Sequence, residues 1–308
     1  MKASLVLQAA AEAAGGQQYP RGALYVVATP IGNLADLTLR AIHVLALVDA
    51  IACEDTRHSA PLLRQFGIDK PLVALHEHNE RQAAGQVLER LARGERVAYV
   101  SDAGTPGVSD PGAELVRTVR SAGQRAIPIP GASSALAALS VAGDPGAEQF
   151  AFVGFLPARG PARAQAARQL AAASAAQIVF EAPHRIVSLA ALLAQVCPER
   201  SVSVARELTK QFESVETLRA ADFPAWLGAD PNRARGEFVV VVHSQAQATD
   251  DATATHDRVL RALLRELPLK QAVGLAAELT GAPRNALYTR ALALKQGVDA
   301  GAAEAGEP

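Results

Sequence analysis

The chain has 308 residues, of which 49% are hydrophobic and 20% are charged, and its formal net charge is -1. This length and composition are typical of a folded protein with more than one domain and exclude a disordered chain. The small net charge excludes a global basic field, so any contact with nucleic acid must come from a local patch.

The first segment, residues 1–20, is expected to be a flexible leader. Polar Gln8, Glu12 and Gln17 interrupt its apolar stretch, which argues against a signal peptide. No apolar run in the sequence approaches the length needed to span a membrane. The cysteines, Cys53 and Cys197, match neither a zinc nor a redox spacing. We therefore expect a cytoplasmic protein with no membrane segment and no metal.

Nine apolar, β-branched segments follow at wide intervals and predict strands, at residues 24–28, 50–53, 72–75, 97–100, 126–129, 152–155, 177–180, 202–205 and 238–242. Helical periodicity separates many of them, for example over residues 34–48, with Asn33 as the expected N-cap. Such alternation predicts an α/β fold with mainly parallel sheets.

Nine strands are many for one open sheet, so we expect two α/β/α domains. The segment Val141-Ala142-Gly143-Asp144-Pro145-Gly146 is a natural joint, which gives an N-terminal domain over 21–143 and a C-terminal domain over 144–244. Residues 245–255 are polar and alanine-rich, and are expected to form a linker. Residues 256–296 predict a small helix-turn-helix-like domain with a net charge of +4, followed by a flexible tail over 297–308.

Four clusters of polar, glycine or proline residues each follow a predicted strand, beginning near Ala28, Val100, Ile129 and Phe180. The carboxyl ends of strands line the ligand crevice in α/β sheets. The second cluster, Ser101-Asp102-Ala103-Gly104-Thr105-Pro106 and the residues up to Gly112, is the most specific, because its glycines permit close approach and its prolines hold the loop rigid. No nucleophile-elbow, P-loop or zincin motif is present, which argues against hydrolase, NTPase and metalloprotease functions.

A set of motifs in a fixed order resembles the small-subunit ribosomal RNA methyltransferases of the tetrapyrrole-methylase-like class. These motifs are LYVVATPIGNLADLTLRA, ACEDTRHS, LHEHNE, VSDAGTPGVSDPG, IPGASSALAALSVAG, FVGFLPARG, FEAPHR, ARELTKQFE, GEFVVVV and LPLKQAVGLAAELTG…RNALY. The resemblance covers roughly residues 22–295, and its specificity lies in the conjunction of the motifs.

The resemblance implies a homodimer that binds S-adenosyl-L-methionine between its two α/β domains. It also implies methylation of the ribose 2'-hydroxyl of a decoding-region cytidine in 16S rRNA, either free or in the 30S subunit. By match, the methyl donor would contact Pro30, Ser101, Asp102, Ala103, Gly104, Thr105, Val108, Pro130, Ala132, Ser133, Ser134, Phe180, Glu181 and Ala182. Phe180 and Ala182 stand where members often carry hydroxyl side chains, so that strand end would offer no hydroxyl contact.

Transfer to a weakly acidic hydroxyl would be helped by a base. The matched clusters offer Asp55, Glu181, His184 and Glu207 as candidates, with Lys210 or Arg57 as a positive partner, and structural ion pairing is the alternative role for each. For contact with RNA, the candidates are Arg57, Arg284, Asn285 and Arg290. The helical domain that carries the last three could instead serve dimerisation.

Two other functions stay open at the level of sequence. One is a methyltransferase that acts on a tetrapyrrole small molecule, which would not need the basic helical tail. The other is a DNA-binding regulator with an α/β ligand-sensing domain, which only the helix-turn-helix-like tail supports.

Overall fold

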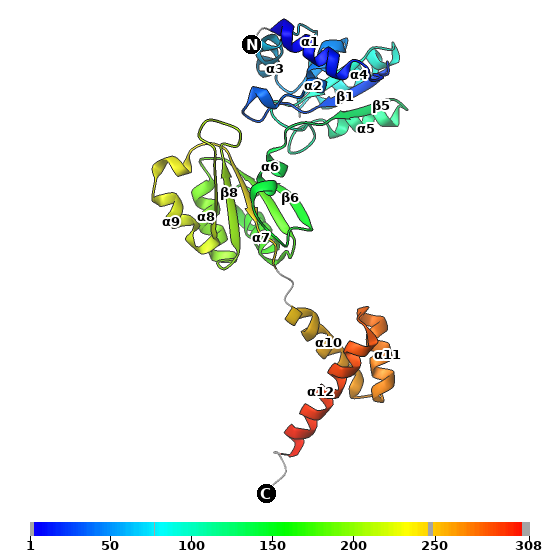
Figure 1. Cartoon of the computed structure of the whole chain (residues 1–308), viewed down its shortest axis with the longest axis vertical. Helices are drawn as coiled ribbons and strands as arrows, with labels where there is room; N and C mark the ends of the chain where they lie inside the picture. Colours follow the sequence, from blue (N-terminus) through cyan, green and yellow to red (C-terminus); the bar gives the residue numbers. More distant parts are fainter. Residues whose placement is uncertain (1–2, 77, 246–248, 304–308) are drawn as a thin grey trace. The chain divides into compact units, whose positions relative to one another are not determined.

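The computed structural model describes residues 3–76, 78–245 and 249–303. It divides into two units at Ser244, an α/β unit before this residue and a helical unit after it (Figure 1). Each unit has a hydrophobic core of its own. The predicted α/β class, with two sheets and a small helical domain, is confirmed.

The first sheet of the α/β unit contains five parallel strands in the order β3-β2-β4-β1-β5. They are β1 (Ala23–Val27), β2 (Ala50–Cys53), β3 (Leu72–Ala74), β4 (Val97–Val100) and β5 (Arg125–Ile129). All of β2 and β4 is buried, because helices cover both faces of the sheet. This burial explains why these strands are continuous apolar runs rather than alternating ones.

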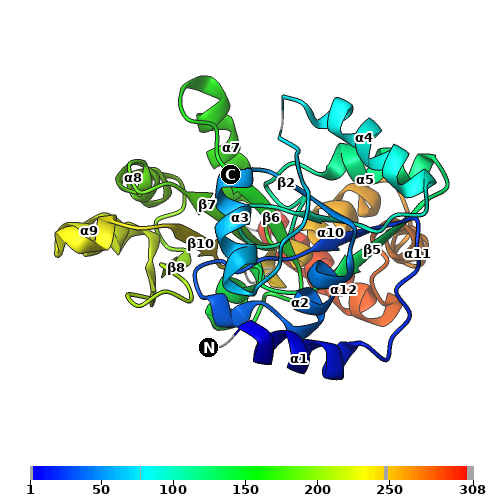
Figure 2. The ribbon, with the colours of Figure 1, turned by 90° about the horizontal axis from the view of Figure 1, so that it is seen from above.

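Helices connect the strands of the first sheet: α2 (Leu39–Leu47), α3 (Thr56–Gln65), α4 (Glu80–Ala92) and α5 (Ala113–Ser121). Figure 2 shows α4 and α5 side by side. The periodic segment 34–48 is not one helix, so Asn33 caps only the short 3-10 helix η1 (Leu34–Asp36). The hydroxyl of Thr38 caps α2 by accepting a hydrogen bond from the backbone N–H of Ala41.

The expected flexible leader is wrong for most of its length. Residues Ala3–Ala14 form helix α1, which packs against α2. Ala10 and Ala14 are buried, and Val6 and Leu7 pack on the core of the first sheet. Gln8 and Glu12 therefore occupy the outer face of an amphipathic helix, and Gln17 lies beyond its end.

The second sheet has the order β6-β7-β10-β8-β9. Its strands are β6 (Phe150–Phe155), β7 (Ala176–Glu181), β8 (Ser201–Arg206), β9 (Ser214–Arg219) and β10 (Phe238–Val242). Only β6 and β7 are parallel, since β10 runs antiparallel to both β7 and β8, and β8 pairs antiparallel with β9. The expectation of mainly parallel strands is thus wrong here, and edge strand β9 was not predicted because its largely exposed sequence contains no apolar run.

Helices α6 (Ser134–Val141), α7 (Gly160–Ala172), α8 (Ile186–Val196) and α9 (Phe223–Gly228) complete the second half. Between α6 and β6, the carboxylate of Asp144 accepts hydrogen bonds from Ser244 and Gly146. These hydrogen bonds tie the segment before β6 to the segment after β10. We keep the sequence-based boundary between residues 143 and 144 as a proposal.

The helical unit consists of α10 (Thr249–Leu264), α11 (Leu269–Thr280) and α12 (Arg284–Ala303). Leu260, Val273, Ala276, Leu287 and Ala291 form its core. The predicted turn at Gly281 is present, with the left-handed backbone that ends α11. The linker expected over 245–255 is wrong from Thr249 onward, because α10 begins there. The flexible tail expected over 297–308 is wrong up to Ala303, because α12 continues to that residue. Residues 304–308 lie outside the described residues.

None of the helices in the described part of the chain is both long enough and apolar enough to cross a membrane.

Candidate functional site

Three neighbouring strands of the first sheet, β4, β1 and β5, end at one edge because they are parallel. The loop after β4 is tied to the segments that follow the other two strands. Thr29 and Gly104 exchange backbone hydrogen bonds of 2.8 and 3.1 Å, and the hydroxyl of Thr105 donates to the carbonyl of Ala132 at 3.1 Å. Three of the four clusters predicted from the sequence, those that follow β1, β4 and β5, are therefore joined at this edge.

The loop after β4 has the conformation that its glycines imply. Gly104 has φ +78°, and a Cβ atom there would lie 3.3 Å from Ile31 Cγ2. Ser109 also has positive φ, at 69°, although it is not a glycine. A left-handed conformation costs a non-glycine residue roughly 1 kcal/mol, which the surrounding contacts must offset.

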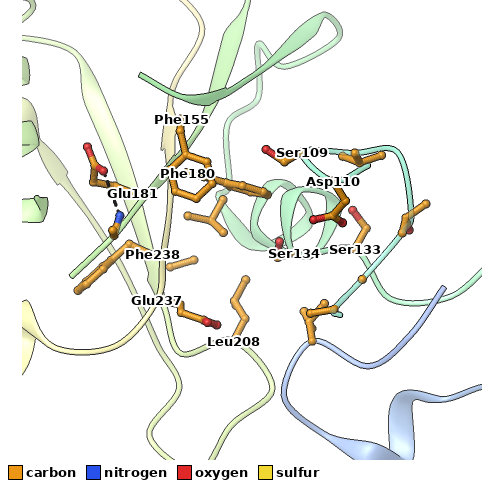
Figure 3. A pocket seen from close by; sticks show the side chains of 18 of the residues that line it. Ser109, Asp110, Ser133, Ser134, Phe155, Phe180, Glu181, Leu208, Glu237 and Phe238 are labelled. Atoms are coloured by element: carbon orange, nitrogen blue, oxygen red, sulfur yellow. Dashed lines mark hydrogen bonds between the residues drawn. The ribbon is translucent and has the colours of Figure 1, made fainter. Parts of the chain in front are cut away.

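A pocket of about 390 Å³ lies between this loop and the ends of strands β7, β8 and β10 (Figure 3). From the first half it is lined by Ile31, Ala103, Gly104, Thr105, Val108, Ser109, Asp110, Ser133 and Ser134. From the second half it is lined by Phe155, Phe180, Glu181, Ala182, Pro183, Ala205, Leu208, Glu237, Phe238 and Val239. Such a mixture of apolar walls and few polar groups is typical of small-molecule sites.

The wall from the second half is aromatic. The ring of Phe180 contacts the rings of Phe152 and Phe155 edge-on, with centroids 5.0 and 5.7 Å apart. Phe155 is 54% exposed, and Phe238 is buried at the start of β10. Flat, apolar surfaces of this kind suit a planar heteroaromatic ring.

The polar side of the pocket is formed by Asp110 and the start of α6. Burial, followed by the negative charge of Glu54, raises the pKa of Asp110 to about 6. Ser133 caps α6, and Ser134 is the first residue of that helix, so the positive end of the helix faces the pocket. Figure 3 shows Ser109, Asp110, Ser133 and Ser134 together on this side.

The residues matched to donor binding separate into three groups. The pocket contains Ala103, Gly104, Thr105, Val108, Ser133, Ser134, Phe180, Glu181 and Ala182. Pro30, Ser101 and Asp102 line a second pocket of about 220 Å³ beside His58. Pro130 and Ala132 line a third, together with Ser133. The donor-binding roles themselves stay predictions.

Sequence reasoning missed several residues that line the first pocket. Asp110 lay within the expected loop but was not singled out, and the residues from β8 and β10 were not considered. A usable signal existed, because Ala205 and Phe238 lie at the ends of predicted strands. Their meeting at the pocket, however, depends on β10 running antiparallel to β7 and β8.

Glu181 has the surroundings of a structural ion pair. Its side chain is completely buried, 3.0 Å from Arg185 Nε and 3.7 Å from Arg163 Nη2. It also accepts a hydrogen bond from the backbone N–H of Ala182. Two guanidinium groups therefore lie beside this buried carboxylate and offset its charge.

Glu207 and Lys210 form a second ion-paired group. Lys210 Nζ donates to Glu207 Oε1 and to Glu237 Oε2, both at 2.9 Å. Burial alone would lower the pKa of Lys210, but these hydrogen bonds outweigh it and raise the pKa. For Glu207, burial alone would raise the pKa, but the Glu237 N–H and Lys210 lower it. The Lys210 stem lies over Gly32, where a Cβ atom would be 2.6 Å from Lys210 Cγ.

Asp55 and Arg57 form an exposed pair at the start of α3. Asp55 is the N-cap of the helix, and Arg57 binds its carboxylate through Nε and Nη2. These hydrogen bonds lower the pKa of Asp55 to about 2. His184 is exposed in the turn after β7 and does not line the pocket. The role of catalytic base, expected for Asp55, Glu181, His184 or Glu207, therefore stays a prediction.

The helical unit holds the other predicted RNA contacts. Arg290 Nε and Nη2 bind the two carboxylate oxygens of Asp257 at 2.6 and 2.8 Å, which joins α12 to α10. Arg284 and Asn285 are exposed at the start of α12. In the described part of the chain, no cluster of three or more His, Cys, Asp or Glu side chains is arranged to hold a metal ion.

Comparison with protein families matches residues 23–224 to the family described as Tetrapyrrole (Corrin/Porphyrin) Methylases. Residues 250–295 match the family described as RsmI C-terminal HTH domain. The two matches fall on the α/β unit and on the helical unit respectively.

The chain is 47% identical over 273 residues to ribosomal RNA small subunit methyltransferase I of Escherichia coli O157:H7, covering 88% of this chain and 95% of that one. It is 49% identical over 269 residues to the protein of the same name from Xylella fastidiosa (strain Temecula1), covering 87% and 98%.

Two solved structures share the fold. Diphthine synthase matches with a TM-score of 0.55 at 17% identity, covering 72% of this chain and 90% of that one. The methyltransferase CobJ matches with a TM-score of 0.54 at 22% identity, covering 72% and 93%.

Proposed function

The chain belongs to the family of ribosomal RNA small subunit methyltransferase I, and from this premise we propose that it transfers a methyl group from S-adenosyl-L-methionine to 16S ribosomal RNA. The acceptor that we propose is the ribose 2'-hydroxyl of a cytidine in the decoding region. The observation that carries the donor assignment is the pocket of about 390 Å³ beside the loop after β4.

The chemistry of this pocket fits the donor. Phe155, Phe180 and Phe238 offer apolar surface for the adenine ring. The start of α6 would bind the carboxylate, and the carboxylate of Asp110 would bind the ammonium group. The volume falls within the roughly 300–1,000 Å³ usual for small-molecule sites.

When bound, the donor supplies an electrophilic methyl group on a sulfonium, so the reaction needs no metal. The role of the chain is to hold the acceptor oxygen in line with that methyl group. The rigid loop after β4 supports such positioning, since three hydrogen bonds tie it to both neighbouring strand ends.

Aromatic contact with the donor can be tested by replacing one side chain. We expect Phe155→Ala to weaken donor binding about 10- to 100-fold, because stacking on an aromatic residue contributes roughly 1–3 kcal/mol per base. Isothermal titration calorimetry measures the affinity. Phe212→Ala is the matched control, since Phe212 is 68% exposed and lies outside the pocket. Equal donor affinity in the two variants would contradict this donor position.

The proposed RNA substrate is supported by residues 256–296, which carry a net charge of +4 and lie almost entirely within the match to the family's C-terminal helix-turn-helix domain. Arg284 and Asn285 are the proposed contacts to the RNA backbone there, with Arg57 on the α/β unit. Arg290 is a further proposed contact, and its pair with Asp257 also joins α12 to α10.

The decisive experiment offers labelled donor to 30S subunits, to naked 16S rRNA and to tetrapyrroles in parallel, followed by mapping of the labelled position. We expect label on a cytidine ribose of the RNA. Label found only in a tetrapyrrole would overturn the proposal in favour of small-molecule methylation. Absence of any transfer would leave a DNA-binding sensor as the better explanation.

We further propose that the protein acts as a cytoplasmic homodimer. An exposed apolar face on edge strand β6, formed by Phe150, Phe152 and Val153, supports association. Light scattering coupled to size-exclusion chromatography measures the mass directly, and a monomer at micromolar concentration would contradict this assembly.

A further inference from the structure

A second pocket, of about 220 Å³, lies beside the start of the loop after β4. Ser101 and Asp102 line it, while the next residues of the same loop, Ala103 to Thr105, line the first pocket. Pro30 and Gly32 form another part of its wall. Two ligands, one in each pocket, would therefore touch consecutive residues of one loop.

A histidine and a carboxylate meet in this second pocket. His58 Nδ1 lies 2.8 Å from Asp102 Oδ2, and the backbone N–H of Asp55 donates to Asp102 Oδ1 at 3.2 Å. An ionised carboxylate can only accept hydrogen bonds, so in the neutral imidazole Nδ1 carries the proton and Nε2 carries the lone pair. Asp102 thus fixes both the tautomer and the orientation of the imidazole ring.

The other ring nitrogen of His58 is available. Its side chain is 69% exposed, and Nε2 has no hydrogen-bond partner within the residues that the structure describes. The site has the arrangement expected of a general base, in which an imidazole is oriented by a third group and presents its basic nitrogen to a pocket.

The carboxylates expected to act as a base are neutralised instead. Asp55 is paired with Arg57, Glu207 with Lys210, and Glu181 with two arginines. Asp110 lines the first pocket, where the donor is placed. His58 lines the second pocket and, in the described part of the chain, has no such cation bound to its ring, and it follows Arg57, whose exposed guanidinium suits a phosphate.

We propose that His58 is the catalytic base of the methyl transfer, and that Asp102 is a positioning residue acting through it; this inference rests on the proposed function. His58 Nε2 accepts the proton of the acceptor hydroxyl while the hydroxyl oxygen bonds to the methyl carbon. The carbon–sulfur bond of the donor breaks with its electron pair on sulfur, and the imidazolium then passes its proton to water. Asp102, matched by resemblance to donor binding, thereby acquires a different role.

The pH dependence follows from the charges around the ring. The hydrogen bond with Asp102 raises the pKa of His58, Asp55 and Glu54 add negative charge, and Arg57 opposes them. Lys210, over Gly32 on the facing wall, is already paired with Glu207 and Glu237. A base acts when deprotonated, so the methylation rate should fall as the pH drops through this raised pKa.

The first test uses single-turnover methylation of 30S subunits at saturating donor. His58→Asn keeps an amide nitrogen near the position of Nδ1 but offers no basic atom, and we expect its rate to fall about 100- to 10,000-fold with unchanged donor affinity. His78→Asn is the control, since His78 is exposed and lines neither pocket. A wild-type rate for His58→Asn would overturn the proposal.

The second test does not depend on activity. Titration of the His58 ring proton by NMR in the free protein should give a lower pKa in Asp102→Asn than in the wild type, and the acid limb of the rate profile should move by the same amount. If the acid limb of the rate profile of Asp102→Asn does not move and the variant binds the donor more weakly, Asp102 binds the donor and its positioning role is overturned. If the wild type methylates no ribosomal RNA, the proposed function fails, whereas an active wild type with an equally active His58→Asn defeats this inference alone.

Discussion

At the scale of single residues, a carboxylate that is paired with cations has a structural role, and Glu181 is an example. Glu181 lies at the end of a strand that lines the pocket, yet its side chain is fully buried beside Arg163 and Arg185. Removing one member of a buried ion pair leaves uncompensated charge, which is strongly destabilising.

We therefore expect Glu181→Gln to lower the free energy of unfolding by about 3 kcal/mol. Urea denaturation measures this loss, with Glu216→Gln on the exposed face of β9 as the control. The folded fraction of Glu181→Gln should still methylate RNA at a rate near that of the wild type. A stable but inactive variant would identify Glu181 as a reactive group instead.

Asp110, unlike Glu181, has no cation bound to its carboxylate within the residues that the structure describes. Burial, and then the negative charge of Glu54, raise its pKa from 3.8 to about 6. The folded state therefore binds this proton more tightly than the unfolded state. The group stabilises the fold at low pH, and this contribution is lost as the pH rises through about 6.

Asp110→Asn removes this titration. Between pH 5 and pH 7.5, we expect the stability of Asp110→Asn relative to the wild type to increase by about 1 kcal/mol, since Asp110 is only half buried. Thermal or urea unfolding at the two pH values measures the change. Asp69→Asn, at an exposed aspartate, should show no such pH-dependent difference, and the same flat result for Asp110→Asn would refute the assignment.

At the scale of elements, helix α4 caps helix α5. Oε1 of Glu80, the first residue of α4, accepts hydrogen bonds from the backbone N–H groups of Gly112, Glu114 and Leu115 at 2.9–3.1 Å. These N–H groups would otherwise lack partners at the start of α5, where the helix dipole also favours a negative charge. The same contact fixes the end of the loop that lines both pockets.

We expect Glu80→Ala to cost about 1–2 kcal/mol in the free energy of unfolding, and to weaken donor binding because the loop loses its fixed end. Denaturation and calorimetry measure the two effects. Glu89→Ala, at an exposed position later on the same helix, controls for the loss of charge. Unchanged donor affinity in Glu80→Ala would show that the loop holds its shape without this cap.

At the scale of the whole molecule, we expect the α/β unit to bind the methyl donor and the helical unit to bind RNA. The α/β unit contains both pockets within residues 1–244, whereas the helical unit has its own small core, and residues 256–296 within it carry a net charge of +4. Truncation after Ser244 should therefore leave donor binding intact and weaken RNA binding, most clearly at low salt, where contacts to phosphates contribute most to affinity. Filter binding with 16S rRNA and calorimetry with donor measure the two affinities. Full RNA affinity in the truncated protein would assign the helical unit to packing or dimerisation.

The sequence by itself determined every strand except edge strand β9, together with the helix-turn-helix and the ligand loop. These features depend on local patterns: continuous apolar runs, helical periodicity, and glycines where the backbone needs positive φ. Parallel order then brings the ends of β4, β1 and β5 together, so one wall of the site could be predicted from strand ends alone.

Only the tertiary structure decided the rest. It packed α1 on α2, placed β10 antiparallel between β7 and β8, and closed the pocket with Phe238. It also decided which charged groups meet, since His58 and Asp102 are 44 residues apart in the chain. Protonation and charge neutralisation depend on distances through space between separate elements, which no local pattern encodes, and for this reason the base could be proposed only from the folded chain.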